Sequence, residues 1–177
     1  VNILQRKNLL YSLEVVAELK KTYPDILYVI TGKPSIHRSI KDHYEELLQK
    51  IREHQLEANV VFLKEKLPDT VPHADVHAFY NLSDAVLYFS KTENFGLPIL
   101  EASLLKTPIF VSALDVFKEL GGEYLDYIDY LTVTPVEAAE RIARRLESDA
   151  EGKLHAKIRR EYSLEHIIKN SVIPLFS

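Results

Sequence analysis

Cysteine is absent from this 177-residue chain, which excludes disulfide bonds and cysteine-based catalysis. No apolar run approaches the ~20 residues that a membrane-spanning helix needs, and no signal peptide opens the chain. An excess of basic charge is also lacking, since 22 lysines and arginines stand against 26 aspartates and glutamates. We therefore expect no nucleic-acid partner and a cytoplasmic location, with a peripheral position at the cytoplasmic face of the membrane as an alternative.

The chain does contain enough apolar material for one hydrophobic core. Hydrophobic residues make up 46% of the sequence, which excludes global disorder, and the length is that of one ordinary domain. The first residue is Val1 rather than methionine, and residues 1–4 have the pattern of the tail of a strand with no turn before it. We therefore expect residues 1–177 to be a single domain, cut at its N-terminus from a longer protein.

Strand-like and helix-like segments alternate along the chain. Continuous apolar runs, which are typical of strands covered on both faces, predict strands over 26–31, 59–63, 85–89, 108–112 and, as a short last strand, 130–133. Apolar spacings of three and four, with their caps, predict helices over 7–21, 39–54, 72–81, 116–120, from Pro135 with Thr134 as N-cap, and over 151–162 and 163–176. The alternation indicates an α/β fold with a doubly wound parallel sheet.

Several polar segments follow the predicted strands directly. They are Gly32, residues 64–66, residues 90–96 and Ser112. Ligands of open parallel sheets bind beyond the carboxyl ends of the strands. We therefore expect these segments to line one edge of the sheet, and that edge is the candidate site.

The most informative segment is residues 92–102, TENFGLPILEA, which lies between two predicted strands. If a helix begins near Phe95, its first N–H groups have no helical partner and attract a phosphate or diphosphate. Gly96 allows close approach of the ligand to the backbone. Glu93 and Glu101 are eight positions apart, and eight helical residues span roughly 12 Å. This spacing suits a ligand with hydroxyls at both ends and a diphosphate between them, such as a nucleotide-sugar.

This segment resembles the Glu-x7-Glu signature of retaining, nucleotide-sugar-dependent glycosyltransferases of the two-domain GT-B type, in particular family 4, or group 1. Four further segments resemble motifs of that family in the expected order: residues 6–10 (RKNLL), 26–32 (ILYVITG), 60–63 (VVFL) and 80–86 (YNLSDAV). The similarity covers nearly the whole chain. It implies that the α/β fold is Rossmann-like and forms one half, the donor-binding half, of a GT-B fold.

The resemblance also implies roles for individual residues. Glu93 would bind hydroxyls of the donor sugar, Glu101 would accept hydrogen bonds from both ribose hydroxyls, and Lys7 would stabilise the diphosphate leaving group. The family pairs this lysine with an arginine, for which Arg6 and a residue before Val1 are the two candidates. Glu93 and Lys7 are thus the expected catalytic residues. The expected donor-binding residues are Arg6, Lys7, Gly32, Glu93, Asn94, Phe95, Gly96, Leu97 and Glu101.

The function implied by the resemblance is that of the donor-binding domain of a retaining glycosyltransferase of the hexosyltransferase type. The donor would be a UDP-, GDP- or ADP-sugar, and the acceptor a glycan, a lipid or a small molecule. The resemblance implies no metal or other cofactor. It also implies a front-face mechanism in which the leaving phosphate itself would help to deprotonate the acceptor. An N-terminal Rossmann domain of the same protein would complete the cleft, so we expect this chain alone to fold but not to transfer sugar.

Two other classes of function remain open at this stage. One is a nucleotide-sugar epimerase or hydrolase of similar fold, and the other is a noncatalytic interaction domain that retains the fold. A zinc site is a third possibility to weigh, since His73 and His77 are spaced i, i+4 and could bind a metal from one helix face. No third ligand is indicated by the spacing, so we expect two partly exposed histidines instead.

Overall fold

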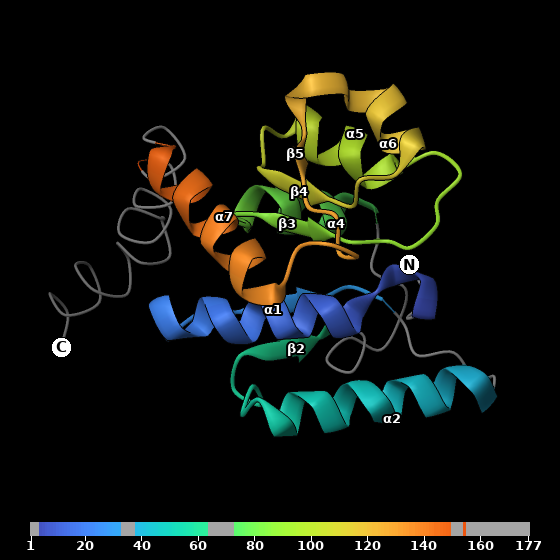
Figure 1. Ribbon diagram of the computed structural model, residues 1–177, viewed down its shortest axis with the longest axis vertical. Helices are drawn as coiled ribbons and strands as arrows, with labels where there is room; N and C mark the ends of the chain where they lie inside the picture. Colours follow the sequence, from blue (N-terminus) through green and yellow to red (C-terminus); the bar gives the residue numbers. More distant parts are fainter. Residues whose placement is uncertain (1–3, 33–37, 64–72, 150–153, 155–177) are drawn as a thin grey trace, which may run out of the picture.

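The structure is a computed structural model that describes residues 4–32, 38–63, 73–149 and 154. For residues 38–41 and 73–76 it describes the backbone alone. Helices and strands alternate along the chain, as the sequence predicts (Figure 1). The elements in order are η1 (Gln5–Lys7), α1 (Leu9–Thr22), β1 (Tyr28–Ile30), α2 (Arg38–Glu53), β2 (Val60–Phe62), α4 (His73–Leu82), β3 (Val86–Tyr88), α5 (Leu97–Leu104), β4 (Ile109–Val111), α6 (Asp115–Gly121), η2 (Gly122–Tyr124), β5 (Asp126–Tyr127) and α7 (Pro135–Ser148).

All strand pairs among the described residues are parallel, which confirms the prediction from the alternating pattern. Backbone hydrogen bonds join the strands into two groups, β1 with β2 and β3-β4-β5 in that order. Tyr28 lies opposite Val60 in the first group, and Val86 lies opposite Ile109 in the second. Leu87 of β3 packs against the hydrophobic clusters of both groups, so the two groups share a continuous core.

Helices cover both faces of the three-stranded group. Successive residues of a strand point to opposite sides, so neighbouring residues of one strand contact different helices. Phe110 of β4 packs with residues of α1 and α7, including Tyr11 and Ile142. Its neighbour Val111 packs on the other side with Ile99 of α5 and with Phe117 of α6. Figure 1 shows α5 and α6 on the side of these strands opposite α1 and α7. The strands are therefore wound with helices on both faces, as predicted.

Helix α1 is central to the packing because it contributes to two hydrophobic clusters. One side of it, with Tyr11, Val15 and Leu19, packs against α7 and the β3–β5 group. Another side, with Leu13 and Val16, packs against α2, β1 and β2. Because its two buried sides hold it in place, the segment that immediately precedes it is also fixed relative to the strand ends.

The predicted start of α7 is confirmed. The Thr134 hydroxyl accepts a hydrogen bond from the N–H of Glu137 at 3.3 Å, and the Glu137 carboxylate accepts one from the N–H of Thr134 at 2.9 Å. Pro135 occupies the first turn, where its missing N–H leaves no helical bond unmade. The predicted helices over 151–162 and 163–176 lie outside the described residues, apart from residue 154.

The predicted last strand over 130–133 is wrong, because these residues form a turn after β5. The backbone carbonyl of Asp129 accepts hydrogen bonds from the N–H groups of Thr132, at 3.1 Å, and Val133, at 2.8 Å. Its carboxylate also accepts from the N–H of Leu131 at 3.1 Å. An aspartate that bonds to nearby N–H groups offers the backbone an alternative to strand pairing.

The chain differs from the prediction again before α1. The sequence predicts a helix from Lys7, whereas η1 ends at Lys7 and α1 begins two residues later. Asn8 lies between them in the left-handed conformation, with φ of 53°, and its N–H donates to the carbonyl of Gln5 at 3.1 Å. Asparagine tolerates this conformation better than most residues. Arg6 and Lys7 therefore belong to a separate turn rather than to the helix.

No helix in the described part of the chain is both long enough and apolar enough to span a membrane.

Candidate functional site

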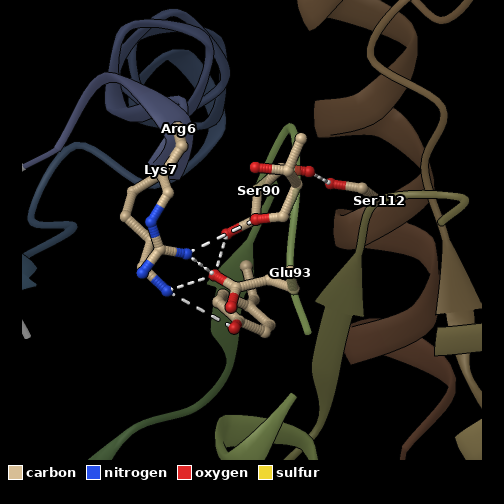
Figure 2. A network of polar contacts seen from close by, with 7 residues as sticks. Arg6, Lys7, Ser90, Glu93 and Ser112 are labelled. Carbon is tan, nitrogen blue, oxygen red and sulfur yellow. Dashed lines mark hydrogen bonds and ion pairs between the residues drawn. The ribbon is translucent and has the colours of Figure 1, made fainter. Parts of the chain in front are cut away.

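Glu93 is the centre of a cluster of charged and polar side chains at the carboxyl end of β3. Its Oε1 accepts hydrogen bonds from Nη1 of Arg6 at 2.7 Å, from the ammonium of Lys7, and from the hydroxyl of Ser90 at 3.1 Å (Figure 2). The side chains of Lys7 and Glu93 are each 11% exposed, and that of Arg6 is 44% exposed. The cluster therefore joins η1 to a loop that lies more than 80 positions away in the sequence.

Backbone contacts hold the two halves of this cluster together. The N–H of Lys91 donates to the carbonyl of Arg6 at 2.7 Å, which ties the loop after β3 to η1. The carbonyl of Ser90 accepts a hydrogen bond from the Ser112 hydroxyl at 2.6 Å, which ties the same loop to the end of β4 (Figure 2). Both serines are fully buried. The sequence places both serines at the expected edge, and the structure assigns them a supporting role there.

Lys7 has a second partner in Tyr88, the last residue of β3. Its Nζ lies 3.4 Å from the Tyr88 hydroxyl and 4.9 Å from the centre of the ring, within the range of a cation–π contact. Burial, and then the nearby Glu93 carboxylate, raise the pKa of Tyr88 well above its usual range. Tyr88 is thus a neutral phenol at physiological pH. The sequence indicates Tyr88 only as a strand residue and does not predict its contact with Lys7.

The charge state of Glu93 follows from its surroundings. Partial burial alone would raise the pKa of Glu93, but the hydrogen bond and charge of Lys7, with hydrogen bonds from Tyr88 and Ser90, lower it below its ordinary value. Glu93 is therefore an anion at neutral pH. Two cations and one anion leave a net charge of +1 on the Arg6, Lys7 and Glu93 side chains, which suits an anionic ligand.

The segment after Glu93 leads into α5 through a left-handed glycine. Gly96 has φ of 101°, and a Cβ atom added there would lie 3.0 Å from Cε1 of Phe117. Helix α5 begins at Leu97, two residues later than predicted, with Pro98 in its first turn. Within the described residues, the backbone N–H groups of residues 94–97 donate no hydrogen bond. The N–H groups of residues 94–96 belong to the loop and N-cap before the helix, and that of Leu97 lies in its first turn, where the partial charge is positive.

Glu101 lies in α5, half-buried, one turn past the first helical residue. Its Oε2 accepts a hydrogen bond from the hydroxyl of Tyr80, in α4, at 2.8 Å. Residues 94–96 form the loop between Glu93 and the start of α5, and Glu101 lies within the helix. The two carboxylates therefore have different surroundings: that of Glu93 lies beside the cations, and that of Glu101 lies beside α4.

Within the described residues, the remaining predicted site residues make no hydrogen bond to the Arg6–Lys7–Glu93 cluster. Gly32 is buried in the segment that follows β1. Asn94, Phe95 and Leu97 are exposed, the latter two at 52% and 60%. The predicted edge segment 64–66 lies outside the described residues. His77 is exposed and the His73 side chain is outside the described part, so the structure does not test that pair. Among the described residues, no group of three or more possible metal ligands comes together.

Comparison with known proteins places this chain in a family. The family model described as "Glycosyl transferases group 1" matches residues 2–163. The "Uncharacterized glycosyltransferase 335" of Sulfolobus islandicus rod-shaped virus 1 is 30% identical over 115 residues, covering 65% of this chain and 30% of that protein. The "Serotype-specific mannosyltransferase WbdA" of Escherichia coli is 28% identical over 122 residues, covering 69% of this chain and 14% of WbdA. The chain therefore spans less than a third of these relatives.

Solved structures share the fold. The C-terminal domain of a glycosyl transferase group 1 family protein, LpcC from Francisella tularensis, superposes with a TM-score of 0.68 at 23% identity, covering 96% of this chain and 82% of that one. HepE from Anabaena, solved with UDP and glucose, superposes with a TM-score of 0.66 at 21% identity, covering 99% of this chain and 46% of HepE. These likenesses confirm the predicted Rossmann-like α/β fold of the GT-B type. With a family match that extends over most of its length, the chain belongs to the glycosyl transferases group 1 family.

Proposed function

We propose that this chain is the donor-binding domain of a retaining glycosyltransferase that takes its sugar from a nucleoside diphosphate sugar. The observation that carries the proposal is the Arg6–Lys7–Glu93 cluster, which is followed directly along the chain by the N–H groups of residues 94–97, and these donate no hydrogen bond within the described residues. A net positive cluster next to a helix N-terminus favours a diphosphate. Support also comes from HepE, which was solved with UDP and glucose, and from WbdA, which is named a mannosyltransferase.

In this proposal the donor lies along the path from Glu93 to Glu101. The diphosphate accepts hydrogen bonds from the N–H groups of residues 94–97. It also replaces the Glu93 carboxylate as the acceptor of the hydrogen bonds from Lys7 and Arg6. Glu93, thus released, accepts hydrogen bonds from hydroxyls of the sugar. Glu101 accepts the ribose hydroxyls with the carboxylate oxygen that Tyr80 leaves open. The cations then stabilise the charge that develops on the diphosphate as the glycosidic bond breaks.

The acceptor and the rest of the catalytic cleft belong to a second domain in this proposal. The chain spans 30% of its viral relative and 14% of WbdA, which is consistent with one domain of a longer protein. We expect the 177-residue chain to fold as one domain and to bind nucleotide, and to need an N-terminal Rossmann domain for transfer. The configuration at the sugar would be retained without a metal, with the departing phosphate assisting deprotonation of the acceptor, at the cytoplasmic side of the cell.

The proposed ribose contact is tested by Glu101→Gln, which keeps the shape of the side chain and removes its charge. Hydrogen bonds to a charged group contribute on the order of 1.5–3 kcal/mol. We therefore expect the affinity for a nucleoside diphosphate to fall at least about tenfold, a change of ~1.4 kcal/mol. Calorimetric titration of both forms with UDP, GDP and ADP measures this. Glu140→Gln, on the exposed face of α7, is the matched control.

Two results would overturn the proposed function. The first is that none of the three nucleotides binds the wild-type chain. The second is that a nucleotide binds wild type and Glu101→Gln with equal affinity, which would return Glu101 to the role of an ordinary helix-face acid.

A further inference from the structure

Tyr80 makes a direct hydrogen bond to Glu101, one of the proposed ligand-binding residues. Its hydroxyl donates to Oε2 of Glu101 at 2.8 Å, across the packing of α4 against α5. Its ring packs partly buried against the cluster that contains Ile99 and Phe117. The contact therefore links a partly buried tyrosine to the carboxylate for which the proposed function has a direct use.

The backbone of Tyr80 is fixed as firmly as its ring. Its carbonyl accepts a hydrogen bond from the N–H of Ser83 at 3.1 Å and another from the hydroxyl of Thr107 at 3.0 Å. Thr107 follows α5 and leads into β4, so the last turn of α4 is tied to the same unit that carries Glu101. The phenol is thus held at a set position relative to α5.

We propose that Tyr80 is a positioning residue that orients the Glu101 carboxylate for ribose recognition. This inference rests on the proposed function. A glutamate side chain has three rotatable bonds, and ordering it when a ligand binds costs conformational entropy. With Oε2 held by Tyr80, the side chain is already ordered, and Oε1 is left to accept the ribose hydroxyls. Preorganisation of this kind increases affinity and also discriminates against ligands that lack the hydroxyls.

The contact persists over the working pH range. Burial is the largest cause that raises the pKa of Tyr80, and the hydrogen bond and negative charge of Glu101 raise it further, far above its usual value. Tyr80 therefore remains a phenol and a donor at any pH at which the protein is used. A hydrogen bond to an ionised acceptor is also among the stronger kinds in proteins.

The test uses Tyr80→Phe, which removes one oxygen and retains the ring in its pocket. UDP, GDP and ADP are each titrated calorimetrically into the chain beside the corresponding 2′-deoxy and 3′-deoxy nucleotides. The measured quantity is the ratio of affinities, ribonucleotide over deoxynucleotide. We expect Tyr80→Phe to lower this ratio at least threefold while the affinity for the deoxynucleotides changes less than twofold.

Tyr127→Phe is the matched control. The hydroxyl of Tyr127 donates to the carbonyls of Gly122, at 2.8 Å, and Phe117, at 3.2 Å, and among the described residues it donates to no carboxylate. We expect this variant to lose some thermal stability and to keep the wild-type ratio. An unchanged ratio in Tyr80→Phe as well would overturn the inference, because Tyr80 would then act only as a structural link between α4 and α5.

Glu101→Gln separates the failure of this inference from the failure of the proposed function. If Glu101→Gln removes the ribose preference and Tyr80→Phe preserves it, Glu101 binds ribose without help from Tyr80. If Glu101→Gln leaves the preference intact, the proposed ribose contact itself is wrong. In the double variant we expect Tyr80→Phe to add no further loss, because its effect acts through the carboxylate that is already altered.

Discussion

Replacing Glu93 by glutamine removes the only negative charge of the Arg6–Lys7–Glu93 cluster and preserves the size of the side chain. In the structure, Oε1 of Glu93 accepts hydrogen bonds from both cations at once. The same carboxylate therefore stabilises the fold and competes with any anion for Arg6 and Lys7. We expect Glu93→Gln to have two opposite effects, a less stable fold and tighter binding of nucleoside diphosphate.

The loss of stability follows from the burial of the partners. Breaking a fully buried ion pair costs ~3–5 kcal/mol, whereas an exposed pair contributes about 0–1 kcal/mol. Lys7 is largely buried but keeps the hydroxyl and ring of Tyr88, and Arg6 is 44% exposed. We therefore expect a loss of about 2 kcal/mol, which lowers the Tm of a domain of this size by roughly 4–8 °C.

The pH dependence of this loss has a definite sign. The folded protein lowers the pKa of Glu93, so the stabilisation is fully present above the unfolded value of ~4.3 and disappears as the pH falls through the lower folded value. The Tm difference between wild type and Glu93→Gln should therefore be largest near neutral pH and vanish in acid. Thermal melts from pH 7 to pH 3 measure this difference.

The gain in affinity comes from removing the competing anion. A tenfold increase in UDP affinity corresponds to ~1.4 kcal/mol, which is less than one charge-assisted hydrogen bond supplies, so we expect an increase of about tenfold. The increase should shrink at 1 M salt, where exposed charges are screened over about 3 Å. In the proposed full-length transferase, sugar transfer should fall, because the glutamine of the variant would no longer offer a charged acceptor to the sugar hydroxyls.

Glu18→Gln is the control, since it breaks the exposed pair between Glu18 and Lys21 on α1. It should leave both Tm and UDP affinity near the wild-type values. If Glu93→Gln instead bound UDP more weakly while remaining folded by circular dichroism, the carboxylate would not compete with the ligand. The proposed exchange of partners at Lys7 would then be refuted.

Two further variants test the fold around the site. Gly96→Ala places a methyl group 3.0 Å from Cε1 of Phe117 at φ of 101°, so we expect a loss of ~1–3 kcal/mol; an unchanged urea midpoint would contradict this strain. Burial raises the pKa of Tyr11 to about 12, so its contribution to stability is complete below the unfolded value of ~10 and is lost as the pH rises toward 12. Between pH 10 and 12, wild type should lose on the order of 2–3 kcal/mol more than Tyr11→Phe in denaturant titrations, and parallel losses would refute the assignment.

Local patterns carried most of the fold prediction. The helix start at Pro135 with its cap Thr134, and the presence of a helix after Glu93, depend on residues within a few positions of each other, and both were predicted, the second two residues too early. The strand predicted over 130–133 had the β-branched and aromatic composition of a strand. It was wrong because Asp129 satisfies the nearby N–H groups and ends the extended segment first.

The contacts within the site were not predictable from such patterns. The sequence indicates Lys7 and Glu93 as site residues with separate tasks, but their direct contact depends on residues 86 positions apart. It also depends on the left-handed conformation of Asn8 and on the backbone bond between Lys91 and Arg6. No periodicity or spacing in one sequence reports a contact of this range.

The ion pairs of Glu93 with Arg6 and Lys7 give a physical reason why the proposed reaction would favour release of its product. In the structure, both cations of the cluster pair with one carboxylate, so a diphosphate would gain only the difference between its own bonds and those that it replaces. A complete donor would bind more tightly than a diphosphate alone, because its sugar hydroxyls would replace the hydrogen bonds that Glu93 loses from Lys7 and Arg6. After transfer the sugar is gone, and a partly buried carboxylate without partners is costly. In the proposed function, Glu93 would then attract Lys7 and Arg6 back from the nucleoside diphosphate, which would favour release of the product over its retention.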